Sequence, residues 1–325
     1  MEFNFLEFKQ DLDLLFSRIQ GITPKMFFDF LRQYTRRKDV VLSIKQDRLT
    51  RKYLMPYLDS IKKFFSYFRE LYDEEIKKLQ QQKSDNVTKK HPYSTSINEY
   101  PIGFCHLITD SVFKSVQKVG LESMFSKVFK TDEIVFKQIY VILDDKYFQN
   151  AMQLGSLYID VANDTFDVKK EKIVVKHIRS VNYKNFRNYE IFAKVAEKYL
   201  NIKLYPNKYF PELYEIFPLI YFSKEYGYNF FDYNLSMFLR DMASDFNLSD
   251  KFRQSDFYKN NELPEEGIRF LSKFVENYSN FNLRELVLQV KSFKDLREFR
   301  ERLGDIFQMV EQITQIPDKI YNSTH

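Results

Sequence analysis

Glycine scarcity is the feature that most limits what this chain can form. Only seven of the 325 residues are glycine, which is about 2% against about 7% in an average protein. They stand apart from one another, as Gly21, Gly103, Gly120, Gly155, Gly227, Gly267 and Gly304. The phosphate loops of P-loop NTPases, dinucleotide enzymes and kinases each need two or three glycines within about seven positions. The sequence therefore excludes these three kinds of nucleotide site.

The cysteine count and the hydropathy pattern bear on the compartment. Cys105 is the single cysteine, so a disulfide framework and a cysteine-built zinc site are excluded. The first residues lack the basic start and apolar run of a signal peptide, and no stretch approaches about 18 uninterrupted apolar residues. We expect a soluble, cytoplasmic protein without a transmembrane segment. A secreted protein whose signal escapes these rules would look the same.

Positive charge is concentrated in one part of the chain, which we call the basic corner. Between Leu31 and Lys52 lie eight basic and two acidic residues, although the whole chain carries a net charge of only +5. The eight are Arg32, Arg36, Arg37, Lys38, Lys45, Arg48, Arg51 and Lys52. The basic corner predicts binding of phosphates or of an anionic membrane surface, with Arg36, Arg37 and Lys38 as candidate cofactor-binding residues. The alternative is a solvated corner between helices. No nucleic-acid-binding motif accompanies it, so nucleic acid is not an expected partner.

The apolar pattern predicts an α+β fold that is predominantly helical. A small central, mixed sheet is expected between N- and C-terminal helical regions. Runs of β-branched and aromatic residues predict strands at 134–143, 156–161 and 172–178. A helix is expected from Asp144-Asp145 to Leu154, closed by Gly155, which would make a βαβ-like unit.

The helical regions are marked by start and stop signals. Thr23-Pro24 predicts a helix start, and Gly120 predicts the end of a helix that begins near Phe104. A long helix is expected from Asp47 to about Gln82, which Pro56 either kinks or opens. The polar segment 84–101 is expected to be a linker. It would divide a helical region, 1–83, from an α+β region, 102–325, whose central strands lie at about 134–178 and whose C-terminal part is helical.

Acidic and amide residues gather at the ends of the expected strands. Carboxylates at the end of a strand hold divalent cations against phosphates in α/β enzymes, so Asp144, Asp160 and Asp164 are candidate ligands for Mg²⁺ or Mn²⁺. Asp160 and Asp164, with His177 near the end of the third strand, are the candidate catalytic residues. Alternation places Asp160 on the same face as Tyr158. The alternatives are structural: turns and caps for the aspartates, an ion pair with lysine for Asp160, and a satisfied structural histidine.

The segment Tyr158-Ile159-Asp160-Val161, after an expected helix and Gly155, resembles the metal-binding strand of sugar-nucleotide glycosyltransferases. In that family a Tyr-hydrophobe-Asp-x-Asp motif holds a metal–diphosphate. Here the second acid falls on Ala162, and Asp164 could replace it only through a turn. The resemblance covers this short segment alone, and it implies a metal-dependent transferase.

Two functions follow, and the sequence does not decide whether the chain is an enzyme. The leading hypothesis is a soluble intracellular interaction or binding protein. It would use its helical faces, the basic corner and exposed members of its 34 Phe and 23 Tyr, with another protein as partner. The alternative is a metal-dependent transferase acting on a nucleotide or another phosphorylated substrate through the acids at 144–167.

Overall fold

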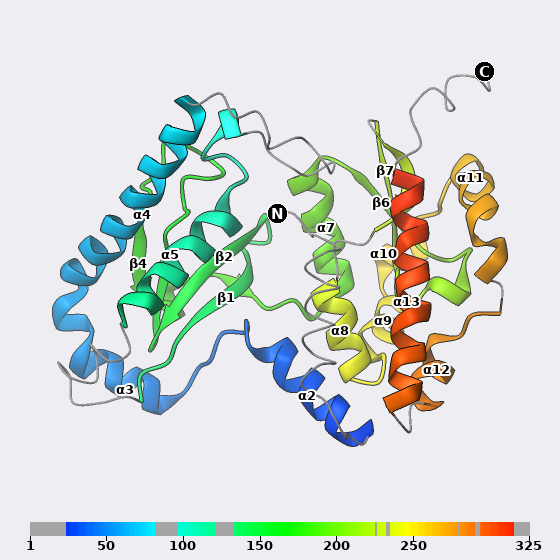
Figure 1. Ribbon diagram of the computed structural model, residues 1–325, viewed down its shortest axis with the longest axis horizontal. Helices are drawn as coiled ribbons and strands as arrows, with labels where there is room; N and C mark the ends of the chain where they lie inside the picture. The colour runs from blue at the N-terminus through cyan, green and yellow to red at the C-terminus, as the bar shows by residue number, and fades with distance from the viewer. Residues whose placement is uncertain are drawn as a thin grey trace. The chain divides into compact units, whose positions relative to one another are not determined.

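The chain divides into two compact units, which Figure 1 shows in a computed structural model. Residues 24–81, 97–120, 133–224, 226–231, 235–278, 280–289 and 293–314 are described. Within them, unit 1 comprises residues from 37 to 185, and unit 2 comprises residues 24–36 together with those from 186 to 314. Each unit has its own hydrophobic core.

Unit 1 is built from an antiparallel sheet and helices that cover it. Its helices are α3 (Ile44–Tyr53), α4 (Leu58–Gln81) and α5 (Cys105–Val119), with short 3₁₀ turns η1 (Met55–Tyr57), η2 (Ile97–Glu99) and η3 (Ile178–Ser180). Its strands are β1 (Phe136–Leu143), β2 (Tyr147–Leu154), β3 (Leu157–Asp160), β4 (Val174–His177) and β5 (Tyr183–Lys184). The strand order is β4-β3-β2-β1-β5.

Every strand pair in this sheet is antiparallel, so the expectation of a mixed sheet is wrong. The cause is the length of the connections. Leu143 pairs with Tyr147, so Asp144, Asp145 and Lys146 connect the two strands, and the Lys146 N–H donates to the Leu143 carbonyl at 2.9 Å. Asp144 and Asp145 both have positive φ, 52° and 53°, as do the two central residues of a type I′ turn. The helix expected over 144–154 is therefore strand β2, and the βαβ-like unit is a hairpin.

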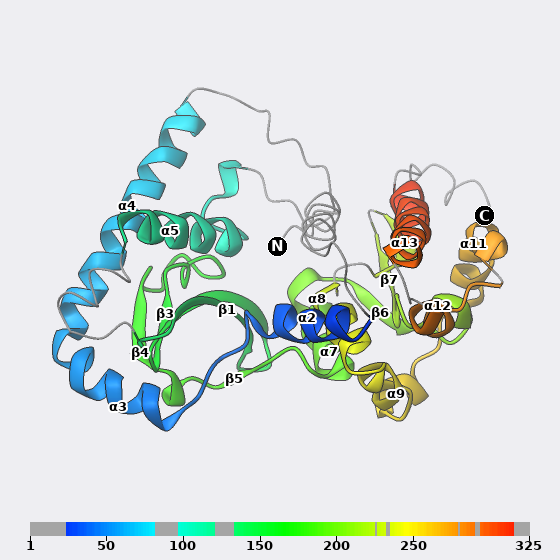
Figure 2. The same cartoon turned by 60° about the horizontal axis from the view of Figure 1, so that its bottom comes forward.

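Two apolar clusters fill the two faces of the sheet. On one face, Phe136, Met152 and Ile159 pack with side chains of α4 and α5, such as Phe65 and Ile108. On the other face, a second cluster comprises Ile139, Val141, Leu143, Ala151, Tyr158 and Ile178. Figure 2 shows the sheet curled, with α5 lying across it. Burial on both faces explains why β2 and β3 are buried almost throughout.

The expected helices of unit 1 form near their predicted limits. The long helix is divided at Pro56, where η1 separates α3 from α4. Gly120 ends α5 with φ 80°, in the left-handed region that glycine adopts without strain. Most of the expected linker, residues 84–96, lies outside the described part of the chain. Residues 97–99 form η2, in which Ile97 is buried. The domain boundaries proposed from the sequence stay a prediction.

Unit 2 is mainly helical around a small second sheet. Its helices are α2 (Pro24–Arg36), α7 (Tyr189–Leu200), α8 (Leu235–Ala243), α9 (Asn247–Arg253), α10 (Asp256–Asn260), α11 (Glu265–Val275), α12 (Leu283–Gln289) and α13 (Phe293–Thr314), with the short turns η4 (Pro211–Leu213) and η6 (Glu276–Tyr278). The strands β6 (Lys203–Pro206), β7 (Leu219–Ser223) and β8 (Gly227–Phe230) form an antiparallel sheet. The sequence did not predict this sheet. The chain as a whole is α+β and helix-rich, as expected.

Candidate functional site

Asp160 lies at the end of β3, where the residue is 2% exposed and its carboxylate is surrounded by donors. The Oδ1 atom accepts from Gln149 Nε2 at 2.8 Å and from the Ala162 backbone N–H at 2.9 Å. The Oδ2 atom accepts from the Tyr158 hydroxyl at 3.0 Å. The expected placement on the same face as Tyr158 is thus confirmed. Burial outweighs these hydrogen bonds and raises the pKa of Asp160 from 3.8 to about 6.

Asp164 is buried in an ion pair with Arg69, a residue that the sequence reasoning did not single out. Two guanidinium nitrogens of Arg69 donate to the two carboxylate oxygens of Asp164, at 2.9 and 3.1 Å. Arg69 Nε donates to Asp73 Oδ1 at 2.7 Å, and Arg69 also donates to the Val161 carbonyl at 2.6 Å. The sequence does contain a signal for the contact between Arg69 and Asp73. Both residues fall on the same side of α4 as its buried apolar residues, and two opposite charges four positions apart on a buried helix face predict an ion pair.

Asp73 joins this ion pair to the surface of unit 1. Its second oxygen accepts from Lys172 Nζ at 2.5 Å, and the Tyr100 hydroxyl donates to its first oxygen. Burial disfavours the charged form of Asp73, but the bonds from Lys172, Tyr100 and Arg69 lower its pKa. Burial likewise opposes the Arg69 cation, and the bonds to Asp164 and Asp73 outweigh it and raise its pKa. Both groups therefore stay charged, and the cluster holds α4 against the chain that follows β3.

His177 lies at the other end of the β3–β4 pair from Asp160. In the register of these strands His177 is opposite Leu157, whereas Asp160 is opposite Val174. The imidazole faces Asp47 on α3, with Nε2 3.5 Å from Asp47 Oδ1. Its Nδ1 accepts from the Arg179 backbone N–H at 3.3 Å and caps the short turn η3. The structure therefore does not bring His177 together with Asp160 and Asp164.

Asp47 is held by three neighbours, of which His177 is one. The Ser156 hydroxyl donates to Asp47 Oδ1 at 2.5 Å, and Arg179 donates to Oδ2 at 2.6 Å. The Ser156 bond is the largest cause that lowers the pKa of Asp47, and Arg179 and His177 add to it. Asp47 is therefore ionised, and these neighbours compensate its negative charge. Ser156 donates to the carboxylate rather than to the imidazole, so the three residues do not form a nucleophilic triad.

The buried face of α3 fixes this helix to the sheet through polar side chains. Gln46 donates to the Glu133 carbonyl at 2.8 Å and accepts from the Val135 N–H at 3.0 Å, at the start of β1. Thr50 Oγ1 accepts from the Ser156 N–H at 2.7 Å. Ser43 caps the first turn by accepting from the Gln46 N–H. The opposite face of α3 is therefore presented outward in a fixed orientation.

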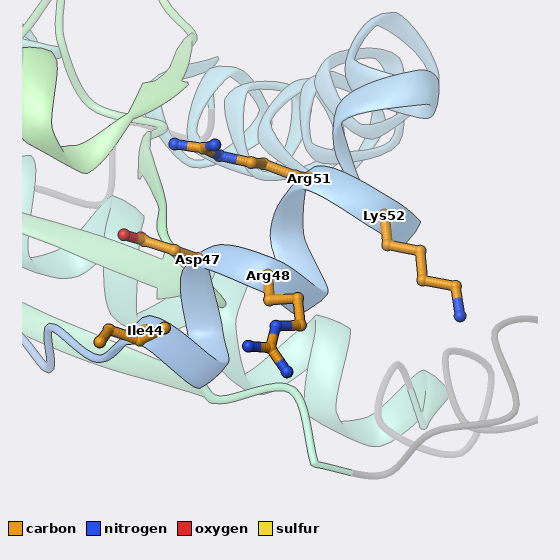
Figure 3. Close-up of a pocket in the computed structure, with 5 residues that line it drawn as sticks. All are labelled: Ile44, Asp47, Arg48, Arg51 and Lys52. Carbon is orange, nitrogen blue, oxygen red and sulfur yellow. The ribbon is translucent and has the colours of Figure 1, made fainter.

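The outward face of α3 carries a hollow of about 490 Å³, lined by Ile44, Asp47, Arg48, Arg51 and Lys52. Figure 3 shows Asp47 and Arg51 directed to one side of the helix and Arg48 and Lys52 to the other. Within the described ranges, neither Arg48 nor Arg51 has a carboxylate within 4.0 Å. Lys52 Nζ lies 4.8 Å from the centre of the Tyr53 ring. We call this surface the α3 hollow. Its three cations belong to the predicted basic corner.

The three residues assigned to cofactor binding lie elsewhere. Arg36 ends α2 in unit 2, whereas Arg37 and Lys38 begin unit 1, and all three are exposed. None of them lines the α3 hollow. The basic corner is thus divided between the two units. Cofactor binding by Arg36, Arg37 and Lys38 stays a prediction.

The proposed metal ligands occupy different places. Asp144 lies in the β1–β2 turn, while Asp160 and Asp164 are engaged by the donors named above. In the part of the chain that the structure describes, no three histidine, cysteine or acidic side chains converge as metal ligands. Binding of Mg²⁺ or Mn²⁺ by Asp144, Asp160 and Asp164 stays a prediction.

Comparison of the chain with protein-family models, with curated proteins and with solved structures gives no match. Among the described helices, none has the length and apolar character needed to cross a bilayer. The function must therefore be argued from the chain's own residues.

Proposed function

We propose that unit 1 is a binding module that takes a phosphate-bearing anion in the α3 hollow. The observation that carries this proposal is the placement of Arg48, Arg51 and Lys52 around one hollow, with no described carboxylate within 4.0 Å of either arginine. Guanidinium groups bind phosphate oxygens through paired N–H donors. Arg48 and Arg51 extend to different sides of α3, so each can contact its own group in a pair of adjacent phosphates.

Asp47 is the one acid among the described residues that line the hollow, and its surroundings reduce its repulsion of an anion. Its two oxygens already accept from Ser156 and Arg179. The Arg179 guanidinium balances the carboxylate charge, so the net charge of the hollow with Arg179 is positive. Asp47 thus serves to hold α3 and η3 together and leaves Arg48 and Arg51 to an outside ligand.

The transferase alternative lacks comparable support. Asp160 and Asp164 point their oxygens at donors of the fold itself, and the Asp164 carboxylate is taken up by the Arg69 guanidinium. A metal bound there would have to displace these donors. The α3 hollow requires no such rearrangement.

Titration of the full chain with inorganic pyrophosphate, followed by calorimetry, tests the proposal. The double variant Arg48→Gln/Arg51→Gln should weaken binding at least about tenfold, because charge-assisted hydrogen bonds contribute about 1.5–3 kcal/mol each. The matched control is Lys77→Gln/Lys78→Gln, which removes two exposed charges near the end of α4 and should leave binding unchanged. Absence of binding at millimolar pyrophosphate, or equal loss in both variants, would overturn the proposal.

A further inference from the structure

The outward face of α3 carries exposed apolar side chains as well as cations. Ile44 is 77% exposed, the highest value among the large apolar residues that the structure describes, and Met55 is 41% exposed. Leu42 and Tyr57, just outside these two, are 51% and 52% exposed. Large apolar groups exposed together, beside polar ones, mark an interaction surface.

These apolar groups share a face with the cations of the α3 hollow. Ile44, Arg48, Arg51 and Met55 follow one another at spacings of four, three and four, which is the spacing of one helix face. Leu54 keeps a right-handed helical backbone, so the phase of α3 continues to Met55. The buried positions Gln46, Thr50 and Leu54 fall on the opposite side.

We propose that this face docks on an anionic phospholipid bilayer, with the phosphate and carboxylate groups of the lipids as the anions of the α3 hollow. The inference rests on the proposed function and specifies its ligand. Ile44 and Met55 enter the boundary between headgroups and acyl chains, and Arg48, Arg51 and Lys52 contact the headgroups.

Charge complementarity and side-chain type together favour a bilayer. A helix lying in a membrane interface combines apolar side chains on one stripe with Lys and Arg whose long stems keep the charge in the headgroup layer. Each cation close to an anionic leaflet adds to the attraction. A free phosphate would use the arginines but gain nothing from Ile44 or Met55. The exposed apolar residues therefore distinguish the two sources of phosphate.

Two kinds of vesicle test the inference with the full-length chain. One is phosphatidylcholine alone, and the other contains about 30% phosphatidylserine, a strongly anionic surface. We expect co-sedimentation with the anionic vesicles and at least tenfold weaker binding to the neutral ones. Arg48→Gln/Arg51→Gln should lower binding to anionic vesicles at least tenfold, and Lys77→Gln/Lys78→Gln should not.

A second pair of variants isolates the apolar contribution. Ile44→Ser/Met55→Ser should weaken binding to anionic vesicles at least fivefold, and Met55→Ser alone, which lies outside the lining of the α3 hollow, should leave pyrophosphate binding unchanged. Leu71→Ser, at an exposed position of α4, is the control and should bind vesicles like the wild type. If Ile44→Ser/Met55→Ser binds vesicles normally, insertion of this face into the bilayer is wrong.

The remaining outcomes separate this inference from the proposed function. Pyrophosphate binding that depends on Arg48 and Arg51, without binding to anionic vesicles, would overturn the membrane inference and leave the anion-binding proposal standing. Absence of both would overturn both. Binding to polyglutamate but not to vesicles would assign the face to an acidic protein partner instead.

Discussion

Arg69 on α4 and Asp164 after β3 form a buried bidentate ion pair, with N–O distances of 2.9 and 3.1 Å between residues 95 positions apart in the chain. Breaking a buried pair by removing one partner leaves the other charge without compensation, which costs about 3–5 kcal/mol. In Asp164→Asn the Arg69 guanidinium keeps its ion pair with Asp73, so the loss should fall at the lower end of this range. We expect the unfolding free energy of unit 1 to decrease by about 3 kcal/mol. Hydrogen exchange of the α4 and β3 amides measures it.

The control for this prediction is a surface pair in the same unit. Asp145 pairs with Lys184 at 2.7 Å, and both side chains are about half exposed. Asp145→Asn should cost less than about 1 kcal/mol, as exposed ion pairs do. Equal losses in the two variants would show that the Arg69 cluster does not stabilise unit 1.

Asp160 predicts a pH dependence of stability. Its folded pKa of about 6 lies above the usual 3.8, so the folded protein binds the proton more tightly than the unfolded chain. The contribution of Asp160 to stability is then fully present below about pH 4 and is lost as the pH rises to about 6, a difference of roughly 3 kcal/mol. Asp160→Asn cannot ionise, so its stability relative to the wild type should improve between pH 4 and 7.

Urea unfolding at several pH values, followed by circular dichroism, measures this difference. Asp241 in unit 2 also has its pKa raised by burial to about 6, but it is present in both proteins and cancels in the comparison. A stability difference that stays constant from pH 4 to 7 would rule out a raised pKa for Asp160. Asp160→Asn also removes the carboxylate without changing its shape, so a change in ligand response at unchanged stability would restore its predicted site role.

The β1–β2 turn predicts a stabilising substitution. Asp144 and Asp145 both have positive φ, and Asn-Gly is the pair most favoured in a type I′ turn. Asp144→Asn/Asp145→Gly should raise the melting temperature. The favoured turn residues should stabilise the protein by about 0.5–1 kcal/mol, from which the contribution of the lost surface ion pair with Lys184 is subtracted. Asp144→Val should lower it, because a β-branched residue is strained at positive φ. If Asp144→Val melted at a higher temperature than Asp144→Asn/Asp145→Gly, the positive φ angles assigned to this turn would be wrong.

Gly155 predicts a destabilising substitution at the turn between β2 and β3. Its φ is +59°, and a Cβ atom there would lie 2.3 Å from Thr50 Oγ1, the atom that accepts from the Ser156 N–H. Gly155→Ala should therefore cost more than about 2 kcal/mol. Gly304→Ala in α13, where no described atom outside the adjoining helix backbone lies within 4 Å of the added Cβ, should instead stabilise by about 0.5–1 kcal/mol. If the melting temperatures of the two variants shifted in the same direction, this prediction would be wrong.

Local signals account for the parts of the fold that the sequence predicted. The β-branched run of β1 and the stop at Gly120 depend on neighbours in the chain, and both are confirmed. Strand β2 was missed because Asp144-Asp145 contains no glycine or asparagine, the usual mark of a tight hairpin turn. The second sheet was missed because prolines at 206, 211 and 218 interrupt its segment. Pro206 lies at the end of β6, where a proline is tolerated.

The candidate site depended more on distant contacts. The basic corner was visible as a run of charge, but only the fold shows that Arg48 and Arg51 line a hollow while Arg36 belongs to another unit. Asp160 has two near neighbours as donors, but Gln149 on β2 and Arg69 on α4, which donate to Asp160 and Asp164, are distant in the chain and no local pattern connects them to these acids. Asp47 with Ser156 and Arg179 is equally non-local.

The discontinuity of unit 2 has a consequence for the order in which this protein is made. Helix α2 packs on α8 in unit 2, yet residues 37–185 of unit 1 lie between them in the chain. The Val40 N–H and the Asn185 side chain are 3.4 Å apart, so the chain enters and leaves unit 1 at neighbouring points. On the ribosome, unit 1 can complete its core while α2 still lacks its partner, because α8 has not been translated. Nascent α2 must keep its buried residue Leu31 from other contacts for the time that roughly 200 further codons require, about 10–40 s at ordinary elongation rates.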